Sequence, residues 1–547
     1  MIAAYSAGAA LLVASFTKGR ERLALSRAKH GSLAGHVRLA KRIASFIPYY
    51  AHGPDLFFRI DGAPEAIAAK RREGFERLSR LFQKRFPKSL ALTCEVRTGL
   101  SDLQFTATYR VPFQFRKMVG EHLAVGAFLQ ASDGVTVTDL DGNLFYDLTG
   151  SYGVNLFGYD FYKSCIREAV EQVDALGPVL GSYHPVVADN VQRLKAISGL
   201  DEMSFHMSGT EAVMQAVRLA RYHSGRSHVV RFCGAYHGWW DDVQPGVGNP
   251  LPANRTYTLA DMSERTLTVL ARRRNIACVL VNPLQALHPN QAAPSDSTLI
   301  DSGRRAGFDR DAYGAWLKRL AEVCAANGII LIFDEIFVGF RLAPGGAAEY
   351  FGIRPDMITY GKTLGGGLPI GVLCGRASLM RRFRDGRPAD ICFARGTFNA
   401  HPYVMGAMNA FLRRLETPAV RALYANLDAR WNHRAEAINR RLAEQDLPVE
   451  VANLSSIWTV CYTRPSRYNW MFQYYLRAEG LALSWVGTGR LIFSLDHGDA
   501  EFEAVADRFI AAAKAMRDDG WWWSNPGTTN RRLRRDILKE ILGRRLR

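Results

Sequence analysis

The chain has 547 residues, of which 48% are hydrophobic and 22% charged, so it can form two or more domains around a substantial core. Its formal net charge is +18, and its eight cysteines are scattered singly with no CxxC pair, which excludes a disulfide framework and a cysteine zinc site. Scattered reduced thiols indicate a cytoplasmic protein. No zinc-finger, RNP or helix-turn-helix signature accompanies the positive charge, so no specific nucleic-acid partner is expected.

Residues 1–95 are predicted to form a basic, helical extension. Residues 2–16 are apolar but too short to span a bilayer comfortably, and no basic residues precede them, which favours an amphipathic or partner-bound helix. Apolar residues then recur at helical spacing as far as Ile47, where Pro48 stops the run. A second helix is expected over residues 64–86, ending at Pro87.

Two segments concentrate the positive charge, because residues 18–42 and 531–547 each contain eight lysines or arginines. Such runs are typical of solvated helix faces and fraying termini. They are also typical of surfaces that meet an anionic partner, which includes an acidic carrier protein. The sequence leaves both interpretations open.

The remaining chain predicts an α/β fold. Residues 96–159 are assigned to a smaller domain, and the alternation over residues 135–147 with a turn at Asp141-Gly142 indicates a β-hairpin. Residues 160–400 alternate short apolar runs with amphipathic helices, which predicts a large domain with a mainly parallel central sheet. Residues 401–525 are expected to complete a small α+β domain, with helices near 403–415 and 419–445, and residues 526–547 form a basic tail.

The candidate catalytic centre is a lysine at the end of a strand. Residues 357–361 form an apolar run that delivers Lys362, and three glycines at 365–367 follow, where backbone can approach a ligand closely. Residues 329–333 deliver Asp334 in the same way, with Glu335 beside it, and spacing alone does not decide which carboxylate points inward. A lysine that forms a Schiff base and a carboxylate on a pyridinium nitrogen are the chemistry of pyridoxal phosphate. The alternative is a strand-end lysine that faces water.

Three further motifs follow the same order along the chain. Ser208, Gly209 and Thr210 open a helix and could cradle a phosphate, although such residues are more often simple helix caps. Tyr236 and His237 follow a strand, where an aromatic side chain could stack on a planar ring or fill the core. Thr397 lies in a turn before a helix and could offer a hydroxyl and an N–H to a phosphate.

At these residues the chain resembles the class III aminotransferases, of fold type I among the pyridoxal-phosphate enzymes. Within them it is most similar to glutamate-1-semialdehyde 2,1-aminomutase and to the aminotransferase modules of polyketide and nonribosomal-peptide assembly lines. The resemblance covers about residues 120–500 and rests on several motifs in the same order, at residues 153–158, 208–214, 236–238, 334–341, 344–346, 360–367 and 396–399.

The resemblance implies a role for each candidate residue. Lys362 matches the Schiff-base lysine, and Asp334, not Glu335, matches the residue on the pyridine nitrogen. The phosphate loop is matched by Ser208, Gly209 and Thr210. Tyr236 matches the ring-stacking aromatic, with His237 beside it in the cofactor site. Thr397 matches the threonine that reaches the phosphate of the neighbouring subunit, which implies a homodimer; no metal is implied.

Two departures concern the substrate end of the site. The family usually has Glu-Pro on the strand before the aspartate, but this chain has Asn282-Pro283, and an asparagine carries no negative charge. Phe337 stands where many members have a polar residue or methionine. With Phe157, Trp239 and Trp240, this aromatic suggests room for an apolar or carrier-tethered substrate.

The sequence supports three functions. The first is transfer of an amino group from an amino donor to a carbonyl acceptor, in secondary-metabolite biosynthesis. The second is an intramolecular 2,1-aminomutase, which needs a lid to retain its intermediate, and residues 239–252 could supply one. The third is a cofactor-free scaffold whose basic ends bind an anionic partner, for which Asn282 is the only support.

Overall fold

The computed structural model describes residues 16–29, 31, 36–244, 246–251, 253–287, 307–484 and 489–545. The helix expected over residues 2–16 lies outside these ranges except for Phe16. The chain forms two units. Unit 1 comprises Met1–Ala44, Ile166–Ala293 and Asp309–Leu415, and unit 2 comprises Ser45–Cys165, Pro294–Phe308 and Glu416–Arg547.

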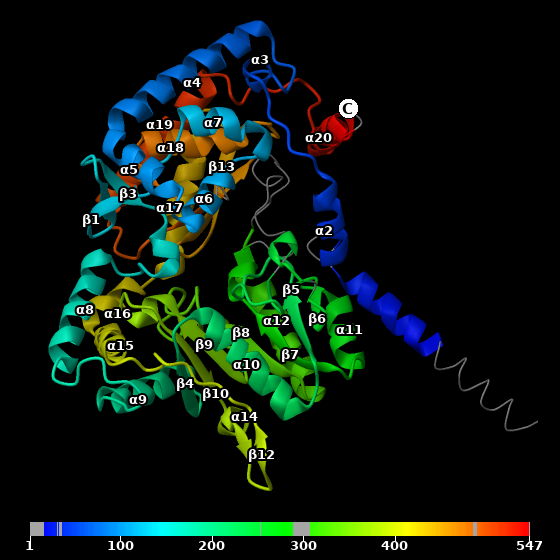
Figure 1. Cartoon of the computed structure of the whole chain (residues 1–547), viewed down its shortest axis with the longest axis vertical. Coiled ribbons are helices and arrows are strands. Elements are labelled where there is room, and N and C mark those ends of the chain that lie inside the picture. Colours follow the sequence, from blue (N-terminus) through cyan, green and yellow to red (C-terminus); the bar gives the residue numbers. More distant parts are fainter. Residues whose placement is uncertain are drawn as a thin grey trace, which may run out of the picture. The chain divides into compact units, whose positions relative to one another are not determined.

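Unit 1 is built on a seven-stranded sheet with the strand order β4-β10-β9-β8-β7-β5-β6 (Figure 1). Neighbouring strands are parallel except at β10, which is antiparallel to both β4 and β9. The carboxyl ends of all strands other than β10 therefore lie at one edge, which is where α/β sheets place their ligand sites. The strands are β4 (Glu202–His206), β5 (His228–Phe232), β6 (Thr256–Leu259), β7 (Ile276–Val281), β8 (Ile330–Asp334), β9 (Met357–Gly361) and β10 (Gly371–Gly375). The mainly parallel sheet predicted from the sequence is thus confirmed.

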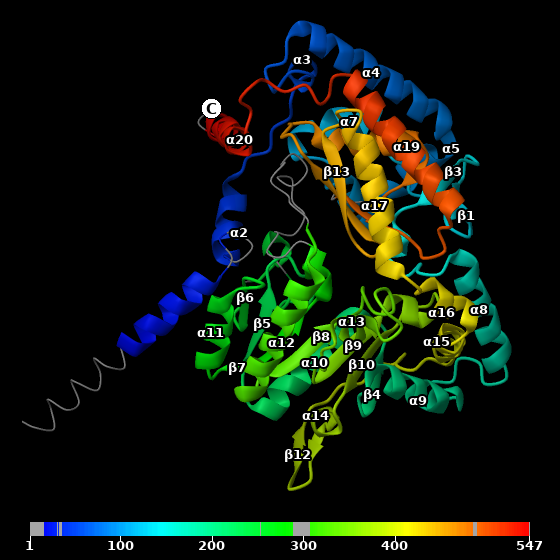
Figure 2. The ribbon, with the colours of Figure 1, turned by 180° about the vertical axis from the view of Figure 1, so that it is seen from behind.

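The central strands are continuous apolar runs because helices cover both faces of the sheet. All residues of β7, β8, β9 and β10 are buried. Helices α10 (Gly209–Ser224) and α12 (Arg310–Ala326) lie on opposite faces, as the two views show (Figures 1 and 2). Helix α11 (Glu264–Arg272) packs beside α12.

Unit 1 runs on to Leu415, so it includes the helix α15 (Pro402–Leu415), which the sequence assigned to the smaller domain. The physical reason is packing. Helix α15 lies against α9 (Val186–Ser198) and against the short 3-10 helix η7 (Lys362–Gly365) that begins with the candidate lysine. A hairpin of β11 (Phe383–Arg384) and β12 (Arg387–Ile391) extends from this unit beyond α14 (Ala377–Met380).

Unit 2 contains two further sheets. One has the order β1-β2-β3-β15 and the other the order β13-β14-β16. The predicted hairpin is confirmed, because β2 and β3 pair antiparallel with Thr136 opposite Tyr146, and Gly142 in the turn has φ 81°. These strands are β1 (Leu129–Asp133), β2 (Thr136–Asp139), β3 (Leu144–Asp147), β13 (Val449–Leu454), β14 (Ile457–Tyr462), β15 (Leu481–Ala482) and β16 (Arg490–Ile492).

The helices of unit 2 agree with the sequence at one point and differ at another. Helix α4 (Glu65–Arg85) ends before Pro87, as predicted. The single helix predicted over residues 419–445 is wrong, because α16 (Pro418–Leu423) and α17 (Leu427–Ala443) are separated where Asn426 adopts φ 53°. Unit 2 also contains the helices α5 (Pro87–Arg97), α6 (Ser101–Thr108), α7 (Arg116–His122), α18 (Phe472–Ala478), α19 (Asp499–Asp518) and α20 (Asn530–Arg545).

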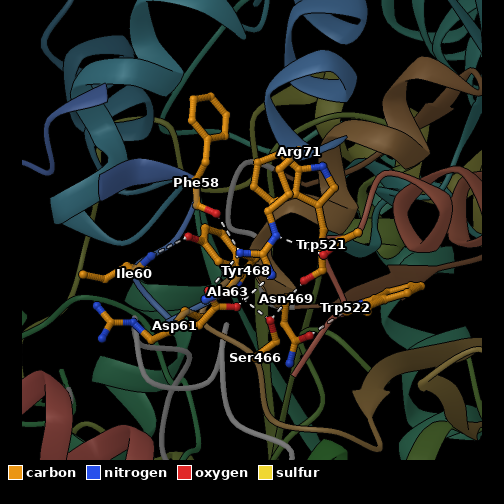
Figure 3. A network of polar contacts seen from close by, with 12 residues as sticks. Phe58, Ile60, Asp61, Ala63, Arg71, Ser466, Tyr468, Asn469, Trp521 and Trp522 are labelled. Atoms are coloured by element: carbon orange, nitrogen blue, oxygen red, sulfur yellow. Dashed lines mark hydrogen bonds and ion pairs between the residues drawn. The ribbon is translucent and has the colours of Figure 1, made fainter. Parts of the chain in front are cut away.

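A buried arginine ties the N-terminal helices of unit 2 to its C-terminal part (Figure 3). Nη1 and Nη2 of Arg71 donate to the carboxylate of Asp61 at 2.9 and 2.7 Å. Nη1 also donates to the carbonyl of Phe58 at 2.8 Å, and Nε donates to the carbonyl of Gly520 at 2.9 Å. The guanidinium lies 4.4 Å from the ring centroid of Tyr468. The N-terminal helices of unit 2 are therefore part of its core.

The basic C-terminal helix also has a specific contact within unit 2. Both oxygens of Glu540 on α20 accept hydrogen bonds from the buried guanidinium of Arg467, at 2.7 and 3.1 Å. Elsewhere all eight cysteines are free, with Cys94 exposed and the others buried. Within the described ranges, no helix combines the length and the apolar character needed to cross a bilayer.

Candidate active site

The strand-end lysine occupies a strained backbone position in unit 1. Lys362 follows β9 directly and has φ 47°, a left-handed conformation that a residue with a side chain adopts only at a cost. Its Nζ lies 5.9 Å from the ring centroid of Phe337. The amine forms no hydrogen bond or ion pair with another described residue. Burial lowers the pKa of this amine below that of a free lysine, against the opposing charge of Asp334.

The carboxylate of Asp334 is held at the end of β8 by three donors. Its Oδ2 lies 2.7 Å from Nδ1 of His237, and both side chains are buried. Its Oδ1 accepts from the backbone N–H of Ile336 at 3.2 Å and, more weakly, from the hydroxyl of Thr359 at 3.4 Å. Because His237 follows β5 while Asp334 ends β8, parallel strands far apart in sequence bring this pair together.

Glu335 plays a different part. Its carboxylate accepts hydrogen bonds from the backbone N–H groups of Ala347 and Ala348, at 2.5 and 2.8 Å, at the start of α13 (Gly346–Phe351). Burial raises its pKa to about 8. Gly346 has φ 78°, and a Cβ there would lie 2.1 Å from the Glu335 carboxylate. The choice that spacing left open is thus made by the fold: Asp334 faces His237, and Glu335 caps a helix.

The start of α10 meets the turn after Tyr236. Gly238 has φ 96°, and a Cβ at this position would lie 2.5 Å from Oγ1 of Thr210. A Cβ on Gly209 would lie 2.4 Å from the side chain of Ile336, which follows Asp334. Both glycines therefore allow a close approach that a larger residue would prevent. As at any helix start, the first N–H groups of α10 have no partner within the helix.

Ser208 is a helix cap in this structure. Its hydroxyl accepts from the N–H of Glu211 at 3.2 Å, and the carboxylate of Glu211 accepts from the N–H of Met207 at 2.9 Å. This reciprocal arrangement stabilises the start of α10. The Ser208 hydroxyl therefore already serves the helix, whereas Thr210 turns its hydroxyl toward Gly238.

Two carboxamides hold the segment that carries Tyr236. Nδ2 of Asn282 donates to the carbonyl of Tyr236 at 3.1 Å, and Nε2 of Gln285 donates to the carbonyl of Cys233 at 2.6 Å. A glutamate at position 282 could not donate such a bond while ionised. In the sequence, Asn282 stands out only as a lost charge, and Gln285 belongs to no motif. Their amide side chains follow β7 at the same sheet edge as Asp334, and this position is the sequence signal that could have identified them as part of the site.

The remaining predicted residues lie around or outside this cluster. The ring of Tyr236 is exposed in the single chain, and Trp239 is exposed as well. Trp240 packs against the core of unit 1, and Phe337 is half-buried. Thr397 is exposed in the segment before α15, and no hydrogen bond among the described residues joins it to the cluster. Phe157 belongs to unit 2.

The chain belongs to the class III aminotransferases, since the model of the family described as aminotransferase class-III matches residues 119–243 and 305–512, more than half of the chain. It is a pyridoxal-phosphate-dependent enzyme of fold type I, as the resemblance implied. Among named relatives, it is 30% identical over 420 residues to glutamate-1-semialdehyde 2,1-aminomutase of Citrifermentans bemidjiense, with coverage of 71% of this chain and 91% of the relative. It is 28% identical over 417 residues to the enzyme of that name from Geotalea daltonii, with coverage of 71% and 90%.

Solved structures give the same class. The chain matches an omega-transaminase from Sphaerobacter thermophilus with a TM-score of 0.59 and 26% identity, covering 72% of this chain and 91% of that one. A glutamate-1-semialdehyde aminomutase from Pseudomonas aeruginosa matches with a TM-score of 0.65 over 82% of this chain and 99% of that one, and its 19% identity makes it a likeness of fold alone.

The residues at this edge fit the cofactor. The amine of Lys362 has no ion-pair partner among the described residues, the carboxylate of Asp334 is oriented by three donors, and the first N–H groups of α10 have no partner within the helix. These are the groups that the aldehyde, the pyridine nitrogen and the phosphate of the cofactor require. They all come from unit 1, so the fit does not depend on the placement of unit 2.

Proposed function

We propose that the chain is a transaminase that moves an amino group from an amino donor to a carbonyl acceptor, with Lys362 as its catalytic residue. The observation that carries the proposal is the amine of Lys362. It is held at a left-handed φ at the carboxyl end of β9, its pKa is lowered by burial, and no ion-pair partner among the described residues occupies it. Such an amine can attach a carbonyl group and can carry a proton.

Each residue of the cluster has a place in this function. Pyridoxal phosphate, when bound, supplies the electron sink that allows a proton to leave the substrate carbon. Asp334 would hold a proton at the pyridine nitrogen, and His237 would orient that carboxylate through its 2.7 Å contact. The neutral amine of Lys362 would carry a proton between the substrate carbon and the C4′ carbon of the cofactor.

The other proposed residues bind. Tyr236 would cover a face of the ring, while Gly209, Thr210 and the N–H groups at the start of α10 would hold the phosphate, next to the Ser208 cap. Asn282 would keep Tyr236 in position through its bond to the Tyr236 carbonyl.

We also propose a homodimer. Thr397 is exposed and makes no hydrogen bond with the cluster among the described residues, so in the proposed dimer it would meet the phosphate site of a second copy. Around it in sequence, Ile391, Phe393 and Phe398 are exposed by 56%, 66% and 52%, which is apolar surface of the kind that an interface buries. The free cysteines are compatible with a cytoplasmic location.

The test is the spectrum and activity of Lys362→Ala. The wild-type protein, supplied with cofactor, should absorb near the visible–ultraviolet border and consume donor and acceptor in equal amounts. Lys362→Ala should lose this band and at least about 10³-fold of the activity, while Lys318→Ala on the exposed face of α12 should keep both. If the wild-type protein shows no such band even after cofactor is added, the transaminase proposal is wrong and the cofactor-free scaffold is favoured.

The alternative within the same chemistry is a 2,1-aminomutase, the activity for which the two relatives above are named. A mutase loaded with the amino form of the cofactor should convert its substrate without added acceptor. A transaminase should stop after one half-reaction. The acceptor that we propose is an apolar or carrier-tethered carbonyl compound of secondary metabolism, because Phe337 lies beside the lysine and Trp239 is exposed near the cluster in sequence.

A further inference from the structure

Unit 2 contains a cavity of about 500 Å³. Its walls come from α5, α6 and α7, from strands β2 and β3, and from α18 with the segment that follows it, so all of them belong to unit 2. Helices α5 and α6 precede residue 119, where the match to the family begins. Part of this cavity is therefore built by a portion of the chain that the family model does not include.

The cavity is lined by four arginines, at positions 97, 110, 116 and 477, and by a single carboxylate, that of Asp147. That carboxylate is already engaged. It accepts from the N–H and the hydroxyl of Thr149, at 2.8 and 2.6 Å, and from the hydroxyl of Tyr159 at 2.8 Å. No ion pair among the described residues joins Arg110 or Arg477 to a carboxylate. The lining thus carries an excess of positive charge.

The two inner guanidinium groups have buried donors without acceptors. Nη1 of Arg110 and Nε of Arg477 are buried and have no hydrogen-bond partner among the described residues. Nη2 of Arg477 donates to the carbonyl of Leu483 at 2.8 Å, which fixes the position of that guanidinium. Burial, and then the charge of Arg110, lowers the pKa of Arg477 to about 9. Two neighbouring cations in a poorly solvated cavity repel each other, and an anion bound between them offsets this repulsion.

We propose that this cavity, which we call the arginine cavity, binds the carboxylate or phosphate group of an organic ligand between Arg110 and Arg477. A guanidinium group pairs with either oxyanion through two parallel hydrogen bonds, so the buried donors would gain acceptors. The body of the ligand is mainly apolar, because Leu90, Leu103, Val119 and Leu123 line the same space. The proposal does not rest on the transaminase function, since every residue that it uses lies in unit 2.

The test is isothermal titration calorimetry of the full chain with octanoate, octyl phosphate and octylamine. Octanoate or octyl phosphate should bind, with an affinity that falls as salt rises, and octylamine should not. The two anions distinguish a carboxylate ligand from a phosphate ligand. Binding of octylamine as tight as that of the anions, or binding of none of the three, overturns the proposal.

Variants assign the binding to the cavity. Arg110→Gln and Arg477→Gln should each weaken anion binding by at least tenfold, while Arg441→Gln, whose guanidinium pairs with Asp507 and Glu503 outside the cavity, should not. Leu103→Trp keeps both arginines and fills the space, so it should also abolish binding. Thermal unfolding of each variant shows that it is folded. Folded Arg110→Gln and Arg477→Gln proteins that bind the anion normally contradict the proposal.

Discussion

The Lys362 centre of unit 1 consists of Lys362, Asp334, His237 and the start of α10. It differs from the arginine cavity of unit 2 in whether its buried ionisable groups have hydrogen-bond partners. In unit 1 the carboxyl group of Asp334 receives three donors and that of Glu335 receives two, so each buried acid has its partners within the fold. In unit 2 the fold does the same for Arg71, yet Arg110 and Arg477 have buried donors without an acceptor in the part of the chain that the structure describes. A buried charge with partners organises its surroundings, whereas one without partners leaves room for a ligand.

The largest expected effect concerns Arg71. Arg71→Ala removes the partner of Asp61 and leaves the carbonyls of Phe58 and Gly520 without a donor, so the free energy of unfolding of unit 2 should fall by about 3 to 5 kcal/mol. The neighbouring Arg72→Ala, at a largely exposed pair with Glu65, should change it by less than about 1 kcal/mol. Urea unfolding measures both. If both variants lose a similarly small free energy of unfolding, the buried Arg71 contributes no more to stability than the surface residue Arg72.

The next effect is the response of unit 2 to acid. Burial lowers the pKa of His52 and of His497 to about 4, so folding excludes the protons that the unfolded chain takes up near pH 6.5. The stability that each contributes is present above pH 6.5 and is lost as the pH falls toward 4, at about 3 kcal/mol for a shift of this size. The raised pKa of Asp496, about 6, opposes part of this loss.

Unit 1 should respond less to acid. His206, with a pKa of about 4, loses stability over the same range. The raised pKa values of Asp261, about 7, and Glu335, about 8, act in the opposite direction, because these groups stabilise the fold below their ordinary pKa and lose that contribution as the pH rises. Hydrogen exchange at pH 7 and pH 5 should therefore show unit 2 opening first. Earlier opening of unit 1 would contradict this ordering.

A smaller effect is expected at a glycine of the Lys362 centre. Gly238 has φ 96°, and a methyl group there would lie against Oγ1 of Thr210. Gly238→Ala should therefore disturb the proposed phosphate site and weaken cofactor retention by about tenfold, with a loss of about 2 kcal/mol of stability. Gly225→Ala, also left-handed at φ 65° but facing open space, should cost only about 1 kcal/mol and retain cofactor normally. Absorbance after dialysis measures the retention.

The smallest effect has the opposite sign. Arg110→Met or Arg477→Met removes a buried cation that has no carboxylate partner, so the free energy of unfolding should stay unchanged or rise by about 1 kcal/mol. The same guanidinium-to-apolar change at Arg71 should destabilise strongly. A loss of 3 kcal/mol or more in Arg477→Met would show that the arginine cavity is held together by its cations, as the Arg71 site is.

Much of the Lys362 centre could be predicted from local sequence. Lys362 and Asp334 each end an apolar run that is too short for a helix, and in a parallel sheet such ends share one edge. The hairpin of β2 and β3 was equally predictable, because its alternation and its Asp-Gly turn are local signals. The interruption between α16 and α17 was not predictable. The helical spacing of apolar residues continues through Asn426, and only the left-handed backbone of this residue breaks the helix.

The sequence by itself therefore determined the fold class and the family, and it predicted that Lys362 and Asp334 share one sheet edge, since these depend on runs and motifs of a few residues. Only the tertiary structure decided the rest. It directed Asp334 rather than Glu335 toward His237, made Asn282 a donor to the Tyr236 carbonyl, and placed α15 with the larger unit. It also gave Arg71 its four acceptor oxygens and left Arg110 and Arg477 without a carboxylate partner among the described residues. The physical reason is that the partner of a buried polar atom is chosen by residues tens to hundreds of positions away, which no local pattern records.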